Sequence, residues 1–223
     1  MTESKRSDPP IALVLIHKAI SRGLATGIHF AQSFAREGYP DRASGAGFAL
    51  YLRTLAGILH QHHSAEDEIA FPFLRDLLPD LPFGDLIAEH EQMEAILEEL
   101  ASILDELHGN AGEGPALKAV SSSLARLDEL WPAHIAVEET GISVKTLEAS
   151  VGAEALGGWL ARMGQHRPEG APPDPVGIPF ILYNLPEEER TIMGAQMPPA
   201  VSQELVPGPW QEHWAPMKPF LLD

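Results

Sequence analysis

The sequence predicts an all-α protein, an up-down-up-down four-helix bundle followed by a proline-rich C-terminal extension. Four long segments place apolar residues at alternating steps of three and four, which puts them on one face of a helix. The connections between these segments are short, and short connections make consecutive helices of a bundle run antiparallel. No segment shows the sustained alternation of apolar and polar residues that is typical of a half-buried β-strand.

The four predicted helices cover residues 9–37, 44–78, 83–108 and 115–149. In the first helix the apolar stripe is Leu13, His17, Ile20, Leu24, Ile28, Ala31 and Phe34. The other three stripes have the same spacing, and each also contains one histidine. We expect Pro72 and Pro132 to kink or restart the second and fourth helices, because proline lacks the N–H group that a helix interior needs.

Proline divides the chain, since 12 of the 20 prolines lie after residue 167. We therefore predict two parts, a bundle over residues 1–160 and an extension over residues 161–223 that is mostly extended and has one short helix beginning at Pro186. The end of the extension, with Trp210 and Trp214, is too apolar for a solvated tail. We expect the extension to pack on the bundle or on a second subunit, which would make a homodimer, and to restrict access to the bundle interior.

The composition excludes several classes of function. The formal net charge of −17 argues against nucleic acid and anionic membrane surfaces as partners. The apolar run Ile11–Ile16 is too short for a signal peptide or a membrane span, so we expect a soluble cytoplasmic protein. The chain has no cysteine, so any metal site must use imidazole and carboxylate, which suit iron, zinc, manganese or copper.

Each predicted stripe contains one histidine that should face the bundle interior, and these are His17, His62, His90 and His134. Glu66 and Glu138 follow two of them by four residues, which brings each pair together on one side of its helix. A buried carboxylate is costly unless it is paired or binds a cation. Two divalent metal ions, capped by the imidazoles and bridged by the two glutamates, would satisfy both carboxylates.

One histidine on an apolar stripe is more often a core residue than a ligand, but one histidine on each of four stripes favours a metal site. The other histidines fall off the stripes or near helix ends. We interpret most of them as structural residues: His29, His60, His108, His166 and His213.

These residues resemble the hemerythrin-like HHE cation-binding family over about residues 10–150. The motifs that carry the resemblance are His17, HHSAEDEIAFP from His62, EHEQM around His90 and HIAVEETGI from His134. The resemblance implies a diiron site, oxo- or hydroxo-bridged, with zinc or manganese as alternative metals. It implies as metal ligands His17, His62, Glu66, His90, His134 and Glu138. It also gives Asp67 and Glu139 supporting positions outside the ligands.

One position departs from the oxygen-carrying hemerythrins, which have another histidine four residues after the third-helix histidine. This chain has Glu94 there. Some family members have a carboxylate beside the second-helix histidine, where this chain has His63, so both residues are secondary ligand candidates. A ligand set richer in carboxylates stabilises ferric iron and supplies a nearby base. The resemblance then implies peroxide or nitric-oxide chemistry, or sensing, as readily as oxygen carriage.

The sequence thus predicts a non-heme diiron protein that binds or senses dioxygen or a related small ligand, or that responds to iron or redox state. Two alternatives stay open: a diiron enzyme that acts on peroxide or nitric oxide with the same ligands, and a metal-free helical interaction module. The expected partner is a small molecule, namely dioxygen, peroxide or nitric oxide, and no residue is assigned a catalytic role.

Overall fold

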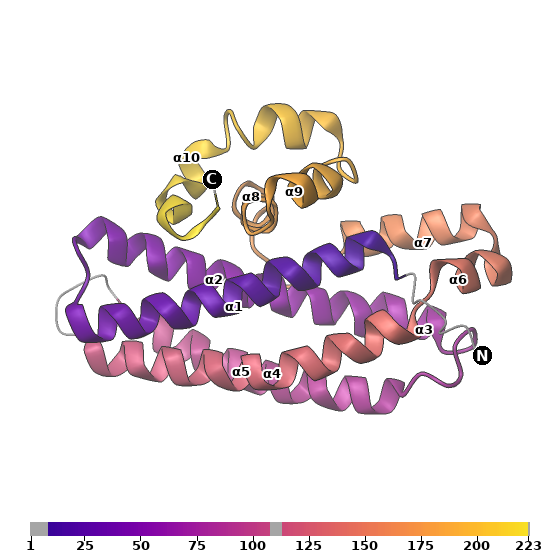
Figure 1. Ribbon diagram of the computed structural model, residues 1–223, viewed down its shortest axis with the longest axis horizontal. Coiled ribbons are helices and arrows are strands. Elements are labelled where there is room, and N and C mark those ends of the chain that lie inside the picture. Colours follow the sequence, from indigo (N-terminus) through magenta and orange to yellow (C-terminus); the bar gives the residue numbers. More distant parts are fainter. Residues whose placement is uncertain (1–8, 108–112, 223) are drawn as a thin grey trace, which may run out of the picture.

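A computed structural model describes residues 9–107 and 113–222, and every regular element in these two ranges is helical. Four long helices lie side by side, and they are α1 (Ile11–Glu37), α2 (Arg42–Ala65), α4 (Phe83–Glu106) and α5 (Gly114–Gly141). Figure 1 shows the C-terminal part of the chain on one side of this group, over α1 and α2. The four long helices therefore form the scaffold, and the later residues cover part of it.

The long helices alternate in direction. The predicted stripe histidines lie near the start of α1 and α4 and near the end of α2 and α5. All four histidines come together at one end of the group, so the starts of α1 and α4 lie beside the ends of α2 and α5. Away from this end the interior is filled by apolar side chains such as Leu24, Phe48, Leu52, Leu100 and Leu124, all fully buried. The amphipathic stripes of the sequence thus face one another in a shared core.

The second predicted helix is divided near Pro72. After α2 the chain forms a π-helical turn, η1 (Glu66–Ala70), and then the short helix α3 (Phe71–Leu74). The Phe71 N–H group donates to the carbonyl of Glu66, five residues back. Because Pro72 has no N–H group to offer the preceding turn, that turn can widen without losing a further hydrogen bond. The wide turn begins at Glu66, one of the predicted ligands.

The fourth predicted helix is shorter than expected, and its proline does not break it. Helix α5 continues through Pro132 without a restart. It ends at Gly141, where Ile142 turns to an extended conformation and the Ser143 side chain accepts a hydrogen bond from the Thr146 N–H group. A serine cap of this kind starts a new helix. The chain therefore continues as α6 (Val144–Val151) and α7 (Ala153–Gln165) rather than as one helix to residue 149.

Helices α6 and α7 lie across the end of the bundle that carries the histidines. Leu147, Leu156 and Trp159 are buried there in one cluster with Phe71 and Leu86. Figure 1 places this helix pair beside α3, at the end opposite the α1–α2 connection. That end of the interior is consequently closed by apolar side chains.

The extension is more helical than the single short helix predicted for it. It contains α8 (Asp174–Tyr183), α9 (Glu187–Gly194), η2 (Ala200–Leu205), α10 (Gln211–Trp214) and η3 (Ala215–Phe220). Several prolines are compatible with helix because they occupy a first turn, where no N–H partner is needed. Pro175 and Pro216 do so in α8 and η3. The helix expected at Pro186 is α9, which begins with three glutamates.

The extension packs on the bundle through buried contacts. The ring of Phe220 lies 4.9 Å from that of Phe30 and 5.3 Å from that of Phe48. The side chain of Asn184, itself buried, accepts a hydrogen bond of 2.9 Å from the Tyr51 hydroxyl and another from Arg22. The contacts join α8 and η3 to α1 and α2, so the extension is part of the same core.

Helix α1 is long and apolar enough, by length and composition, to cross a membrane. In the structure it is a core helix of the bundle, and Leu15, Ile20 and Leu24 are buried against its neighbours. His17 on the same face has no exposed surface. The buried face of α1 thus packs in the interior of the bundle.

Candidate metal centre

Four histidines, one from each long helix, meet inside the bundle. The ring centroids of His17 and His62 are 5.0 Å apart, and those of His90 and His134 are 4.7 Å apart. None of the four side chains is more than 8% exposed. The position of each histidine on an apolar stripe explains its inward direction, since a stripe residue faces the core.

Two buried glutamates lie between the histidine pairs. Glu66 Oε2 lies 3.3 Å from His62 Nε2 and 3.5 Å from His90 Nε2. Glu138 Oε2 lies 3.3 Å from His17 Nε2, and its Oε1 lies 3.5 Å from His134 Nε2. Glu138 therefore reaches one histidine on its own helix α5 and one on α1, and Glu66, which directly follows α2, reaches one on α2 and one on α4.

These six residues form two overlapping groups that could each hold a cation. One group joins His17 and His62 to both glutamates, and the other joins His90 and His134 to both glutamates. Within each group the candidate ligand atoms lie within 4.8 Å of one another. Because Glu66 and Glu138 belong to both groups, two cations bound here would share them as bridges.

Many ligand atoms of the cluster lack a hydrogen-bond partner although they are buried. The unpartnered atoms are His17 Nε2, His62 Nε2, His63 Nε2, Glu66 Oε2, Glu138 Oε1 and Glu138 Oε2. An unsatisfied buried polar atom costs about 1–3 kcal/mol, so a group of them in one place needs a compensating partner. Cations bound in the two groups would supply partners to these nitrogen and oxygen atoms.

Carboxylates outside the cluster fix how the histidines present their nitrogens. The Nδ1 atoms of His17, His90 and His134 donate to Glu139, Asp67 and Glu89, at 2.8, 2.9 and 2.8 Å. A neutral imidazole that donates from Nδ1 keeps a lone pair on Nε2. The Nε2 atoms therefore face inward as acceptors, which is how metal-binding histidines are oriented by their outer hydrogen bonds.

The His90 and His134 Nε2 atoms lie only 3.0 Å apart. Since both rings donate from Nδ1 to a carboxylate, two lone pairs face each other at this distance unless a proton or a cation lies between them. A metal ion that binds both nitrogens removes this conflict.

Burial alters the protonation of the cluster. It lowers the pKa of His62 well below the usual value for histidine and raises the pKa of Glu66 well above the usual value for glutamate, with Glu138 adding to the rise. Burial also acts to raise the pKa of Glu138, but interactions with His17 and His134 outweigh it and lower that pKa. The raised pKa favours the protonated form of Glu66, and a cation bound beside it would compete with that proton.

Aromatic rings surround the cluster and separate it from solvent. The Trp131 ring lies 5.4 Å from that of His17 and 5.7 Å from that of His62, and its Nε1–H group donates to the Ser21 hydroxyl. The Phe71 ring stacks on His90 at 5.5 Å. The site thus offers four imidazoles and two carboxylates inside an aromatic surrounding, and this set of donors fits a pair of divalent cations. The donor types alone are compatible with iron, zinc or manganese.

The secondary candidates differ in position. His63 is buried, and it forms a third potential cation group with His90 and His134. Glu94 belongs to none of the three groups found among the described residues, and its two oxygens instead interact with His60 and His63.

Three residues near the site have roles that the sequence interpretation missed. Glu89 holds His134, although only its place directly before His90 could have indicated this. His60, interpreted from the sequence as a structural residue, contacts Glu94 and the backbone of Glu169. His166 contacts the Ser64 hydroxyl at 2.8 Å. His29 is exposed, and His108 lies outside the described residues.

A family model with the description "Hemerythrin HHE cation binding domain" matches residues 12–143. The matched span covers more than half of the 223 residues and contains all six clustered residues. It ends before α6, so the match gives no account of the later helices. Comparison with curated proteins and comparison with solved structures each find no match.

Proposed function

Because the chain belongs to the hemerythrin HHE cation-binding family, we propose that it is a non-heme diiron protein that binds or senses dioxygen or a related small ligand. His17 and His62 would hold one iron, and His90 and His134 would hold the other. Glu66 and Glu138 would bridge the two. The scaffold would be an up-down-up-down bundle with its proline-rich extension, in a soluble cytoplasmic protein.

The observation that carries this proposal is that both glutamates belong to both cation groups. A single cation would engage one histidine pair and leave the other pair with unpartnered nitrogens. Two cations engage all four histidines, and each carboxylate then has one oxygen available for each metal. The two negative charges also offset part of the positive charge that two buried cations bring into the bundle.

Iron, when bound, would supply reversible ligand binding and electron transfer with oxygen-type molecules. The protein contributes orientation and protection. Glu139, Asp67 and Glu89 keep the Nε2 lone pairs directed inward. Trp131 and Phe71 keep water away from the ligands, and that strengthens electrostatic interactions inside the site. Only a small molecule could reach a site walled in this way, which supports dioxygen, peroxide or nitric oxide as the partner.

Metal analysis of the protein produced with iron in the medium tests the proposal. We expect about two iron ions per chain, as in other dinuclear bundle sites, together with near-ultraviolet absorption bands of an oxo-bridged pair. A protein without bound metal would instead be a helical interaction module, and a single zinc ion would indicate a mononuclear site. Turnover of peroxide or nitric oxide by the iron-loaded protein would make it an enzyme that uses the same ligands.

A further inference from the structure

We propose that His63 is a third imidazole ligand on the His90–His134 side of the site, and that Glu94 is the residue that positions it. The inference rests on the proposed diiron site and adds one ligand to it, from α2. It also gives Glu94 a different role from that of a direct ligand.

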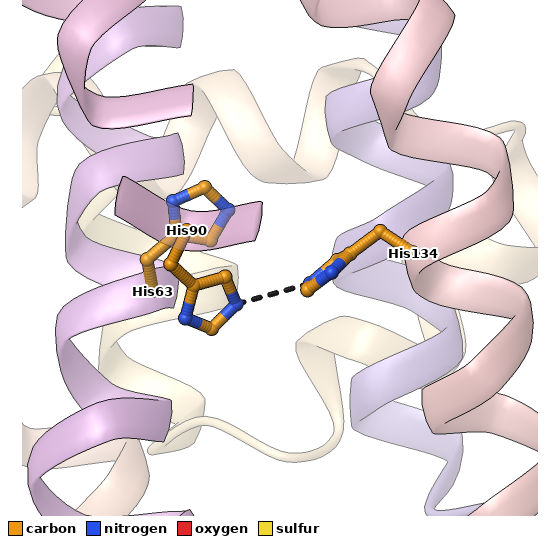
Figure 2. Close-up of side chains that lie close together, drawn as sticks. All are labelled: His63, His90 and His134. Atoms are coloured by element: carbon orange, nitrogen blue, oxygen red, sulfur yellow. Dashed lines mark hydrogen bonds between the residues drawn. The ribbon is translucent and has the colours of Figure 1, made fainter. Parts of the chain in front are cut away.

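The first support is the place of the His63 ring. Its side chain is 1% exposed, and its Nε2 atom is buried without a hydrogen-bond partner. The ring lies against that of His90, with centroids 4.2 Å apart and planes 20° from parallel, so one of the rings must tilt for both nitrogens to bind one cation. One nitrogen each from His63, His90 and His134 lies within 4.8 Å of the others, and Figure 2 shows these three rings together between facing helices.

The second support is the hydrogen bond on the other nitrogen. His63 Nδ1 lies 3.2 Å from Glu94 Oε1, so His63 donates outward and keeps its Nε2 lone pair inside. His17, His90 and His134 each have an outer carboxylate in the same relation. Glu94 therefore matches the carboxylates that orient ligands, and a ligand with such a partner is more basic and better aligned.

The third support is that Glu94 is itself held. Its Oε2 atom lies 2.9 Å from His60 Nδ1, and His60 Nε2 lies 3.1 Å from the carbonyl oxygen of Glu169. Gly57 and Gly170 permit this close packing, because a Cβ atom added at Gly57 would lie 3.0 Å from the Gly170 carbonyl oxygen. The chain of contacts runs from the start of the extension through His60 and Glu94 to His63.

With His63 included, five imidazoles and two carboxylates surround the pair of metals. This set has as many histidines as that of the oxygen-carrying hemerythrins described above. In those proteins the additional histidine lies on the third helix, whereas here it lies on α2. The His17–His62 side then has one protein donor fewer than the His90–His134 side.

The test compares His63→Gly and His63→Ala with the wild-type protein after iron loading and dialysis against a chelator. We expect iron to fall from about two ions per chain to about one, with loss of the near-ultraviolet bands. Free imidazole added to His63→Gly should restore the second iron and the bands, because it can occupy the space that the side chain leaves. Thermal unfolding of the metal-free variants monitors the fold.

The role of Glu94 is tested with Glu94→Ala, Glu94→Gln and the control Glu98→Ala, an exposed glutamate one turn further along α4. Glu94→Ala should release the second iron at about 10–100-fold lower chelator concentration, as expected for loss of an outer hydrogen bond to a ligand. Glu94→Gln should be intermediate, because its carbonyl oxygen can still accept from His63. Glu98→Ala should match the wild type.

Two results separate failure of this inference from failure of the proposed function. A wild-type protein without iron would overturn the proposed function itself. A wild-type protein with a full iron pair, alongside a His63→Gly variant with the same iron content and spectrum, would overturn only the role of His63. Equal chelator sensitivity of Glu94→Ala and Glu98→Ala would overturn the positioning role of Glu94.

Discussion

The two halves of the bundle interior are built from the same four helices but differ in what completes them. In the half near the α1–α2 connection, Phe34, Phe48 and Leu104 pack against one another and need nothing further. In the other half, histidines and glutamates occupy the same stripes and leave polar atoms without partners. The first half is stable through apolar burial, whereas the second contains buried polar groups that a bound ion would satisfy.

The two halves of the interior therefore have different roles. The apolar half and the extension fix the positions of the helices, so the polar half can hold its ligands in place at some cost in stability. A change in the apolar half should therefore lower the free energy of unfolding and leave the metal site intact. A change in the polar half should release metal and leave the metal-free protein folded.

The largest effect is expected for Glu138→Ala or Glu66→Ala. Each substitution removes a carboxylate shared by both cation groups, so iron content should fall from about two ions per chain to nearly none. Elemental analysis of the purified variants measures this. His29→Ala replaces an exposed histidine and should keep the full iron content. Equal iron loss in all three variants would show that the stripes do not identify the ligands.

Phe48→Ala should have the largest effect on the apolar half. Phe48 is fully buried, and truncation of a buried phenylalanine lowers the free energy of unfolding by about 3–5 kcal/mol. Chemical denaturation of the metal-free protein measures the loss, and the folded variant should still bind the wild-type amount of iron. Ile11→Ala, at a residue that is 47% exposed, is the control. Loss of iron from folded Phe48→Ala would contradict the separation of the two halves.

Gly47→Ala tests the packing of the extension. A Cβ atom at Gly47 would lie 2.1 Å from the carbonyl oxygen of Pro216, so α2 and η3 would have to move apart. We expect a loss of about 1–3 kcal/mol in the free energy of unfolding, as for other overpacked sites, with unchanged iron content. Gly84→Ala, where nothing lies within 4 Å, should be neutral or slightly stabilising. Equal stability of the two variants would mean that η3 does not pack tightly on α2.

The smallest effect is expected for Glu89→Gln, which changes an outer partner and keeps every ligand. The Nδ1 atom of His134 would lose a charged acceptor at 2.8 Å but could still donate to the amide oxygen. We expect iron affinity to fall by up to about 10-fold, the lower end for outer hydrogen bonds to ligands. Competition with a chelator measures it, and Glu91→Gln, at an exposed position on the same helix, is the control. If the two variants had the same iron affinity, Glu89 would have no role in orienting His134.

Much of the site could be predicted because it follows from periodicity along single helices. His62 and Glu66 lie four residues apart on one helix face, and the structure brings them within 3.3 Å. His134 and Glu138 have the same spacing and lie 3.5 Å apart. The resemblance to the family added Asp67 and Glu139 as outer residues, and in the structure they contact the Nδ1 atoms of His90 and His17.

The burial of residues beside the stripes could not be predicted in this way. A prediction from one apolar stripe per helix assumes that each helix is buried on one side only. Helix α2 is covered by α1, by α4 and by the extension, so the adjacent residues His62 and His63 are both buried. His60 is covered by Glu169 and Gly170, more than 100 residues away in sequence. Contacts of this kind depend on how the extension returns to the bundle, and no local pattern reveals that.

The helices of the extension were missed for a related reason. Proline count indicates where helices are interrupted but does not show that Pro175 and Pro216 occupy first turns. The break after Gly141 was missed because the apolar pattern continues through Ile142 and Leu147, while the Ser143 cap that restarts the helix is a single residue.

A crystal structure of the iron-loaded protein, with anomalous scattering measured at the iron absorption edge, tests the central claim most directly. We expect two iron positions, one bound by His17 and His62 and the other by His90 and His134, with Glu66 and Glu138 bound to both. A single metal position, or an iron pair that Glu66 and Glu138 do not bridge, would contradict that claim.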